Sequence, residues 1–348
     1  MTLLASDDTI TMPGAPALPG LVFRHFRGPA DYPGLTEANN ASEAADGEEW
    51  VATVEEIAHI HENVVNYDPA RDLIIAAVDG RIIGSAFGSW RLETDGLYRF
   101  QIILTLMPEW RGRGLRRTML RWLEARLREV AADLPADAPK VFALGAPEQA
   151  ESLRALLESE GYHVARYFYQ MVRPLDEPIP DFPLPDGLEL RPVTPDQYRA
   201  IWDTYHEAFR DHWGFSPRPD SYFEWWISEP IFNPALWQVA WDAATGEIAG
   251  QVQTFIDDDE NEAFQRRRGY TETISVRRPY RRRGLARAMI VESLRTLKAQ
   301  GMTESALNVD SESITGASRV YTDCGFRIKN QHLAYRKPLA TPSGRPIS

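Results

Sequence analysis

The sequence has little cysteine and no long hydrophobic run. Cys324 is the single cysteine among 348 residues, so an internal disulfide is excluded, as is typical of proteins in a reducing compartment. No apolar stretch approaches the roughly 20 residues that a membrane-spanning helix needs. The first twenty residues carry Asp7 and Asp8 where a secretory signal would carry basic residues, and we expect them to form a flexible tail. These features predict a cytoplasmic protein with no membrane partner.

Positive charge is also in short supply. The formal net charge is -12 and the isoelectric point is about 5.2. Such a balance argues against nucleic-acid binding, because attachment to phosphates needs positive charge over a broad surface. No set of side chains has the spacing of metal ligands, so no metal is expected. The length, with 43% hydrophobic and 25% charged residues, predicts two globular domains.

The sequence contains an internal repeat of two copies. Four marks recur in the same order at offsets of 164 to 170 residues: LVFR with LELR, VDGRIIG with TGEIAG, WRGRGL with YRRRGL, and ESEGY with YTDCGF. Between the copies, the segment RPLDEPIPDFPLPDG has five prolines and predicts a stiff linker. We therefore predict a tail at 1–20, an N-terminal domain at 21–175, a linker at 176–187, a C-terminal domain at 188–340 and a tail at 341–348.

Each copy has the same order of predicted elements. A strand and helical segments precede two strands joined by a glycine turn, and a further strand runs through an Arg/Gly turn into a long helix. In the second copy this helix extends from Gly284 to Gly301, with an apolar stripe at 286, 289, 290, 294 and 297. A strand, a helix and a strand complete the copy. The pattern predicts an α/β or α+β fold with a mixed sheet.

Five arginines lie between Arg277 and Arg283, where a strand gives way to this helix. The first turn of a helix has main-chain N–H groups without intrahelical partners and the positive end of the helix dipole, so it binds phosphate readily. Gly284 would let the backbone approach a pyrophosphate closely. The segment therefore predicts an anion site, although an arginine-rich stretch is also compatible with a solvated surface.

The motif Arg281-x-x-Gly284-x-Ala286, after a strand that ends at Val276, resembles the acetyl-CoA signature of the GNAT acetyltransferase superfamily. About forty residues later, the segment LNVDSESITGASRVYTDCGFR resembles the second signature of that superfamily. Its matching residues are Ala317, Tyr321, Gly325 and Phe326. The tandem arrangement is similar to that of the mycothiol synthase-like branch, and the resemblance covers nearly the whole chain.

The resemblance implies two tandem GNAT domains, each an α/β domain with a mixed, centrally splayed sheet flanked by helices. Acetyl-CoA would be the cosubstrate, with its pantetheine arm in the splay and its pyrophosphate at the helix start. The residues implied in cofactor binding are Ile274, Ser275, Val276, Arg281, Arg282, Arg283, Gly284, Leu285, Ala286, Arg287, Ser313 and Ala317. Members of the superfamily often have an asparagine near the position of Ser313.

The first copy departs from these signatures at two positions. Arg116 stands where a glycine or alanine is expected, and Leu157 stands where the second copy has Tyr321. Leucine cannot donate a proton, so we predict that the first domain is catalytically degenerate. A second cofactor site at Arg111, Gly112, Arg113 and Gly114 is one interpretation, and a packing partner for the second domain is the other.

In the second copy, Tyr321 is the expected general acid, because a phenol with a pKa near 10 can protonate a thiolate. Glu272 is the expected general base, and the main-chain N–H of Val276 would polarise the thioester carbonyl. Strict strand alternation puts Glu272 on one face with Ile274 and Val276, unless a β-bulge intervenes. The expected acceptor-binding residues are His206, Glu207, His212, Trp213 and Phe215.

Together these features predict an acetyl-CoA-dependent N-acetyltransferase that acts on the primary amine of a small molecule, by direct attack in the C-terminal domain. Two alternatives stay open: a noncatalytic acyl-CoA sensor or scaffold, and an acetyltransferase for protein N-termini or lysines. The chain is expected to be a monomer or a homodimer.

Overall fold

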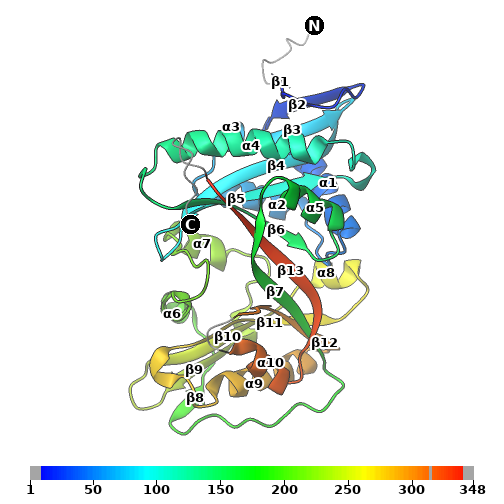
Figure 1. The fold of residues 1–348 in the computed structure, drawn as a ribbon. Coiled ribbons are helices and arrows are strands. Elements are labelled where there is room, and N and C mark those ends of the chain that lie inside the picture. The colour runs from blue at the N-terminus through cyan, green and yellow to red at the C-terminus, as the bar shows by residue number, and fades with distance from the viewer. Residues whose placement is uncertain (1–8, 313–315, 340–348) are drawn as a thin grey trace. The chain divides into compact units, whose positions relative to one another are not determined.

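The structure is a computed structural model that describes residues 9–312 and 316–339. These residues form two compact units (Figure 1). The first contains the residues up to Ala165 together with those from Leu333 onward, and the second is Arg166–His332. The predicted boundaries at 21–175 and 188–340 refer to copies in the sequence. The units begin and end elsewhere, because each includes a strand segment from the other copy.

The first unit is a mixed sheet in the strand order β1-β2-β3-β4-β5-β6, antiparallel except for the parallel pair β5–β6. Its elements are β1 (Thr9–Ile10), β2 (Leu21–His25), η1 (Pro29–Asp31), α1 (Tyr32–Ala45), α2 (Val54–Asn63), α3 (Pro69–Asp72), β3 (Leu73–Val78), β4 (Arg81–Leu92), β5 (Tyr98–Leu106), η2 (Pro108–Trp110), α4 (Leu115–Ala132), β6 (Lys140–Pro147) and α5 (Glu151–Ser159).

Two hydrophobic cores cover the two faces of this sheet. On one face, Met119 and Leu123 of α4 pack with Phe100 of β5. On the other face, Leu35 of α1 packs with Ile75 of β3. A strand between two cores must be apolar on both sides, which explains the uninterrupted LIIAAV run of β3. The helices α1 and α4 accordingly lie on opposite sides of the sheet in Figure 1.

The second unit repeats the arrangement in the strand order β7-β12-β11-β10-β9-β8, with β11–β12 as the parallel pair. Its elements are β7 (His163–Pro174, which begins in the first unit), β8 (Leu188–Leu190), η3 (Pro195–Gln197), α6 (Tyr198–Phe209), α7 (Ser221–Ile227), η4 (Pro234–Leu236), β9 (Gln238–Asp242), β10 (Ile248–Ile256), α8 (Asp258–Ala263), β11 (Arg268–Val276), η5 (Arg278–Tyr280), α9 (Leu285–Ala299), β12 (Glu304–Asp310), α10 (Ala317–Asp323) and β13 (Arg327–Pro338, which ends in the first unit). The predicted α/β fold with mixed sheets is confirmed.

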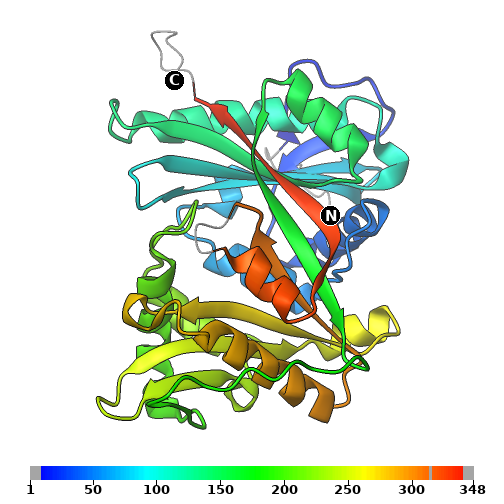
Figure 2. The ribbon, with the colours of Figure 1, turned by 60° about the horizontal axis from the view of Figure 1, so that its bottom comes forward.

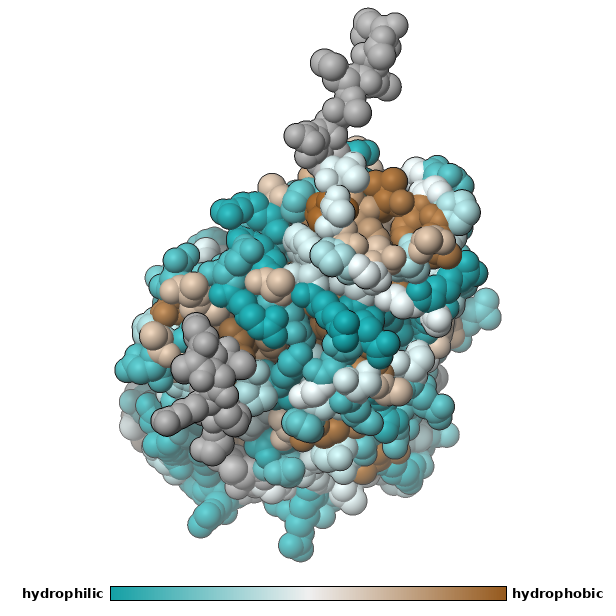
Figure 3. Space-filling model, turned by 45° about the horizontal axis from the view of Figure 1, so that its top comes forward, coloured by the Kyte–Doolittle hydropathy of each residue, from teal (hydrophilic) through white to brown (hydrophobic). Residues whose placement is uncertain are grey.

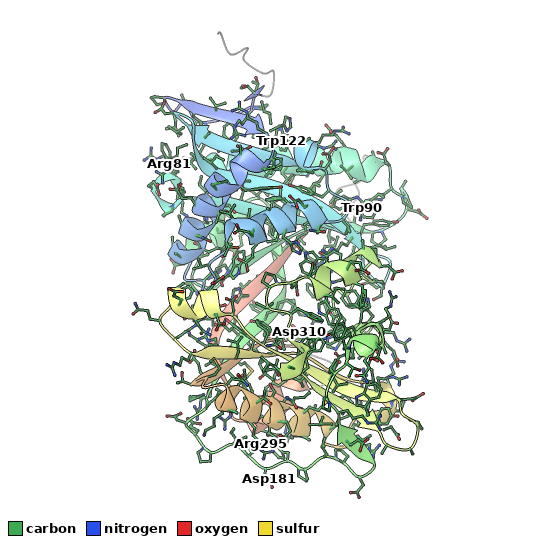
Figure 4. The ribbon with its side chains drawn as sticks, turned by 180° about the vertical axis from the view of Figure 1, so that it is seen from behind. Arg81, Trp90, Trp122, Asp181, Arg295 and Asp310 are labelled. Carbon is green, nitrogen blue, oxygen red and sulfur yellow. The ribbon has the colours of Figure 1, made fainter. Side chains whose placement is uncertain are left out.

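The proline-rich segment 176–187 lies along α9. Phe182 and Leu184 pack against the core beneath this helix. Asp181 forms an ion pair with Arg295 of α9 at 3.1 Å, and both residues are labelled in Figure 4. Figure 2 shows the segment in green beside the helix. The segment is therefore held to the second unit along its length.

Four buried hydroxyl groups join α9 to the sheet of the second unit. Ser293 contacts both Thr254 of β10 and Thr271 of β11, at 2.7 and 2.8 Å, and Thr271 contacts Ser305 of β12 at 2.8 Å. All four side chains are fully buried. The strand registers and helix starts place Gly88, Ile102, Leu123 and Phe142 at the corresponding positions of the first unit. The two units thus share a fold with different cores.

In the described part of the chain, no helix has both the length and the apolar character needed to cross a bilayer. On the face shown in Figure 3, hydrophilic side chains predominate, and hydrophobic ones gather mainly in one patch near the top of the view.

Candidate active site

The sheet of the second unit opens between β11 and β12. The two strands pair only from Arg268 opposite Glu304 to Tyr270 opposite Ala306. Beyond that point β12 continues to Asp310, paired on its other side with β7, while β11 runs on to Val276. The two strands therefore diverge, and beyond this point they are no longer paired with each other.

A β-bulge in β11 lies at the apex of this opening. Gln251 of β10 faces Ser275, but Gln253 faces Glu272, so β11 has one extra residue. The bulge includes Thr273, whose φ of 51° is unfavourable for a β-branched residue. β5, the corresponding strand of the first unit, pairs with β4 without any shift in register. The bulge is a feature of the second unit only.

The bulge changes which side chains share a face. Thr271 bonds to α9, and Ile274 and Val276 pack in the core on the same side. Glu272 faces the other side, because its cross-strand partner Gln253 is bonded to Gln251, whose amide reaches α6. The prediction from strict alternation, that Glu272 shares a face with Ile274 and Val276, is therefore wrong.

Glu272 closes the apex of the opening with its side chain. Its Oε1 accepts hydrogen bonds from the main-chain N–H of Asn308 at 2.7 Å and from Asn308 Nδ2 at 3.1 Å. Burial raises the pKa of this carboxyl to about 7, and the bonds from Asn308 oppose the rise. The residue nevertheless retains partial exposure. A carboxyl with these properties is half ionised at neutral pH, as a general base requires.

Tyr321 of α10 lies close to Glu272. Only 7% of the residue is exposed. Its pKa is raised first by burial and then by the negative charge of Glu272, which places the two groups within electrostatic reach of each other. Within the described residues its hydroxyl has no hydrogen-bond partner. The phenol is thus protonated at neutral pH and available as a donor.

The turn before α9 has the geometry of an anion site. Gly284 is the N-cap with φ 89° and ψ -4°, and no side chain caps the helix. A Cβ at this position would meet no atom within 4 Å, so the glycine is required by its backbone conformation and leaves open space outside the helix start. Leu285 is buried in the core, whereas Ala286 is a small residue with partial exposure. The N–H groups of this first turn are free to bind phosphate oxygens.

Most arginines of the segment are engaged with other parts of the unit. Arg277 pairs with Glu207 and Arg278 with Asp211, at 2.9 and 2.6 Å. The remaining contacts are Arg281 with the carbonyls of Val276 and Ala208, Arg283 with the carbonyl of Asp186, and Arg287 with Asp323. Arg282 is exposed and has no partner among the described residues. The arginines therefore mainly tie the turn to α6 and the linker.

The remaining cofactor positions are distributed around the opening. Ser275 is buried on the α6 side, and its Oγ has no hydrogen-bond partner among the described residues. Ala317 is the first residue of α10, after Gly316 with φ 69°. Ser313 lies outside the described residues.

The five predicted acceptor residues lie on α6 and the loop after it. His206 donates from Nδ1 to the carbonyl of Trp202, and its ring lies 5.9 Å from that of Phe215. Burial lowers the pKa values of His206 and His212. Trp213 lies 6.1 Å from Phe168, the β7 partner of Asp310, and Glu207 is engaged by Arg277. The loop thus approaches the end of β12 that also carries Asn308.

The turn before α4 in the first unit keeps the same backbone shape, with Gly114 at φ 86° and Gly112 at φ 74°. Its side chains differ. Arg111 binds Asp46 of the α1 C-terminus through two bonds of 2.8 Å, and Arg113 lies over the ring of Trp110. Arg116 is buried and reaches Asp46 at 3.3 Å. Arg116, at the position of Ala286, is therefore engaged in an ion cluster with Asp46 and Arg111.

The sequence analysis missed three residues of the site, namely Gln251, Gln253 and Asn308. Each is polar in a strand, and the corresponding positions of the first unit, by strand register, are Ser85, Phe87 and Gly145. A position-by-position comparison of the copies would have shown these differences. The extra residue of the bulge changes the offset between the copies by one within β11, so an alignment with a constant offset does not match Glu272 with its counterpart.

Residues 198–326 match the acetyltransferase (GNAT) family. The mycothiol acetyltransferases of Salinispora tropica and Salinispora arenicola are 30% and 29% identical to the chain, in each case over 77% of this chain and 82% of the relative. A GCN5-related N-acetyltransferase from Sphaerobacter thermophilus has 27% identity and a TM-score of 0.69, with 94% of this chain and 97% of that one covered. A tandem GNAT protein from the clavulanic acid biosynthesis pathway shares the fold, with 14% identity and a TM-score of 0.64 over 94% of this chain and 100% of that one.

Proposed function

The chain belongs to the GNAT acetyltransferase family and is therefore an acyltransferase, and from this premise we propose that its second unit transfers the acetyl group of acetyl-CoA to the primary amine of a small molecule. The observation that carries the proposal is the half-buried Glu272 held by Asn308 at the apex of the opening between β11 and β12, with the buried phenol of Tyr321 within reach of its charge. The relatives are named for mycothiol, which supports a small molecule rather than a protein as the acceptor.

Each group of the second unit then has one task. The N–H groups after Gly284, with Arg282, bind the pyrophosphate. The pantetheine arm lies in the opening, where Ala286 leaves room, and the main-chain N–H of Val276 polarises the thioester carbonyl. Loop 212–215 borders the acceptor.

The chemistry is a direct attack. Glu272 takes one proton from the ammonium form of the acceptor, so that the neutral amine can form the N–C bond. The C–S bond then breaks, the nitrogen loses its second proton to solvent, and the thiolate receives a proton from Tyr321. Solvent returns a proton to Tyr321, and Glu272 releases its proton to solvent. The products are the acetamide, free coenzyme A and the original enzyme.

Thiol release from acetyl-CoA tests this proposal. The acceptor panel contains glucosamine, an amino-acid ester, spermidine and a peptide with a free N-terminus. We expect one small amine to raise thiol release above hydrolysis, and Tyr321→Phe and Glu272→Gln each to lower kcat by about 100-fold or more. Tyr98→Phe, the same change in the first unit, should keep wild-type kcat. Binding of acetyl-CoA without turnover of any amine would contradict the proposal.

A further inference from the structure

Two glutamines of β10 form a chain of side-chain amides that begins at α6. Gln251 is fully buried, and its Nε2 donates to the main-chain carbonyl of Ile201 at 2.8 Å. A carbonyl can only accept, so this contact fixes the orientation of the Gln251 amide. Its Oε1 consequently faces away from α6 and accepts from Gln253 Nε2 at 2.9 Å. Gln253 must therefore present its own Oε1 at the end of the chain.

That oxygen lies beside the candidate base. Gln253 and Glu272 are directly opposite each other on antiparallel strands, so their side chains share a face, with Cβ atoms about 5 Å apart. Gln253 is partly exposed, and its Oε1 has no partner within the part of the chain that the structure describes. A hydrogen-bond acceptor of fixed orientation thus stands next to Glu272 and faces outward.

The first unit has no such chain. Ser85 and Phe87 take the positions of the two glutamines, and Ile103 takes that of Glu272. Phe87 instead packs its ring against His61 and Tyr67, at 4.8 and 5.5 Å. The oriented amide therefore occurs in the unit that also contains Glu272 and Tyr321.

We propose that Gln253 is a substrate-positioning residue that accepts a hydrogen bond from the acceptor nitrogen and selects primary amines. This inference rests on the proposed function. A neutral primary amine has two N–H groups. One can point to Glu272 and the other to Gln253, which directs the lone pair away from the strands and toward the thioester. A secondary amine has one N–H and an alcohol has one O–H, so neither satisfies both oxygens, and an acceptor that bound substrate shields from water without bonding to it is costly.

The test compares Gln253→Leu, Gln253→Glu and wild type, with the most active amine of the panel and its N-methyl analogue. Gln253→Leu keeps the size of the side chain and removes the acceptor oxygen. We expect its KM for the amine to rise about tenfold and its preference over the N-methyl analogue to fall, with the KM for acetyl-CoA unchanged. Gln253→Glu retains an acceptor oxygen but cannot donate to Gln251, so it should bind the amine better than Gln253→Leu does, a result that a role confined to the amide chain does not give.

Gln101→Leu is the matched control, because Gln101 is a partly buried strand glutamine of the first unit. It should keep wild-type constants. An unchanged amine KM and an unchanged preference in Gln253→Leu would overturn the role of Gln253 while leaving the proposed function standing. Absence of turnover by the wild-type protein with every amine would overturn the proposed function itself.

Discussion

At the scale of single residues, the site depends on a carboxyl whose environment opposes its charge. Glu272 is buried enough to raise its pKa to about 7, and two donors from Asn308 and one from Thr273 limit the rise. Glu272 lies on the α6 face with its cross-strand partner Gln253, and the bulge that follows it turns Ile274 and Val276 to the α9 face. The extra residue in β11 thus separates Glu272 from the apolar face of the strand that follows it.

The pH dependence of turnover should report this carboxyl. Since only the ionised form can take a proton, kcat at saturating amine should fall as the pH drops through about 7. In Glu272→Gln, the low remaining kcat should no longer fall as the pH drops through about 7. Measurement of kcat from pH 5 to 9 checks the expectation, and an unaltered fall in the variant would assign the titration to another group.

Stability gives a second readout that does not depend on the acceptor. A carboxyl whose pKa is raised by folding favours the native state fully below its unfolded value near 4.5, and this contribution is lost as the pH rises through about 7. Glu272→Gln should therefore raise the Tm at pH 8 and leave it nearly unchanged at pH 4.

At the scale of elements, both units use the same turn to begin their long helix. Gly114 and Gly284 are N-caps with almost equal φ and ψ, and a Cβ would be unobstructed at either one. Their shared conformation is thus a property of the fold, while the neighbouring side chains differ. This pair allows backbone strain to be separated from ligand binding.

Substitution of alanine at each glycine makes the comparison. Gly284→Ala and Gly114→Ala should each lower the free energy of unfolding by about 1–2 kcal/mol, because L-residues resist positive φ. Only Gly284→Ala should also weaken acetyl-CoA binding, as measured by calorimetry. Equal losses of affinity in the two variants would show that the effect is a general consequence of strain.

At the scale of the whole molecule, the two copies have diverged in core and site alike. The second unit has buried hydroxyls, a bulge and an amide chain, where the first has apolar residues and a regular strand. In the first unit, a buried arginine, Arg116, stands where the second has the small Ala286, and it pairs with Asp46. We therefore propose that only the second unit binds acetyl-CoA.

Calorimetric titration should give a stoichiometry of about one acetyl-CoA per chain. Gly284→Val should abolish this binding, since a β-branched residue strongly disfavours positive φ at the helix start. Gly114→Val should leave the stoichiometry at about one. A value near two for the wild-type protein would mean that the first unit also takes the ligand.

The sequence alone determined the duplication, the α/β class and the strand–Arg/Gly turn–helix segment. These features are encoded in local periodicity and in glycines that their turns require, so they can be read without knowledge of distant contacts. It also singled out Tyr321 through a resemblance, and Glu272 through strand alternation. The tertiary structure decided the rest. The bulge puts Ile274 and Val276 on the face opposite to Glu272. The partners of the arginines, Asn308 and the amide chain from Ile201 to Gln253 come from separate elements. Such contacts depend on which strands and helices meet, and no local pattern records that.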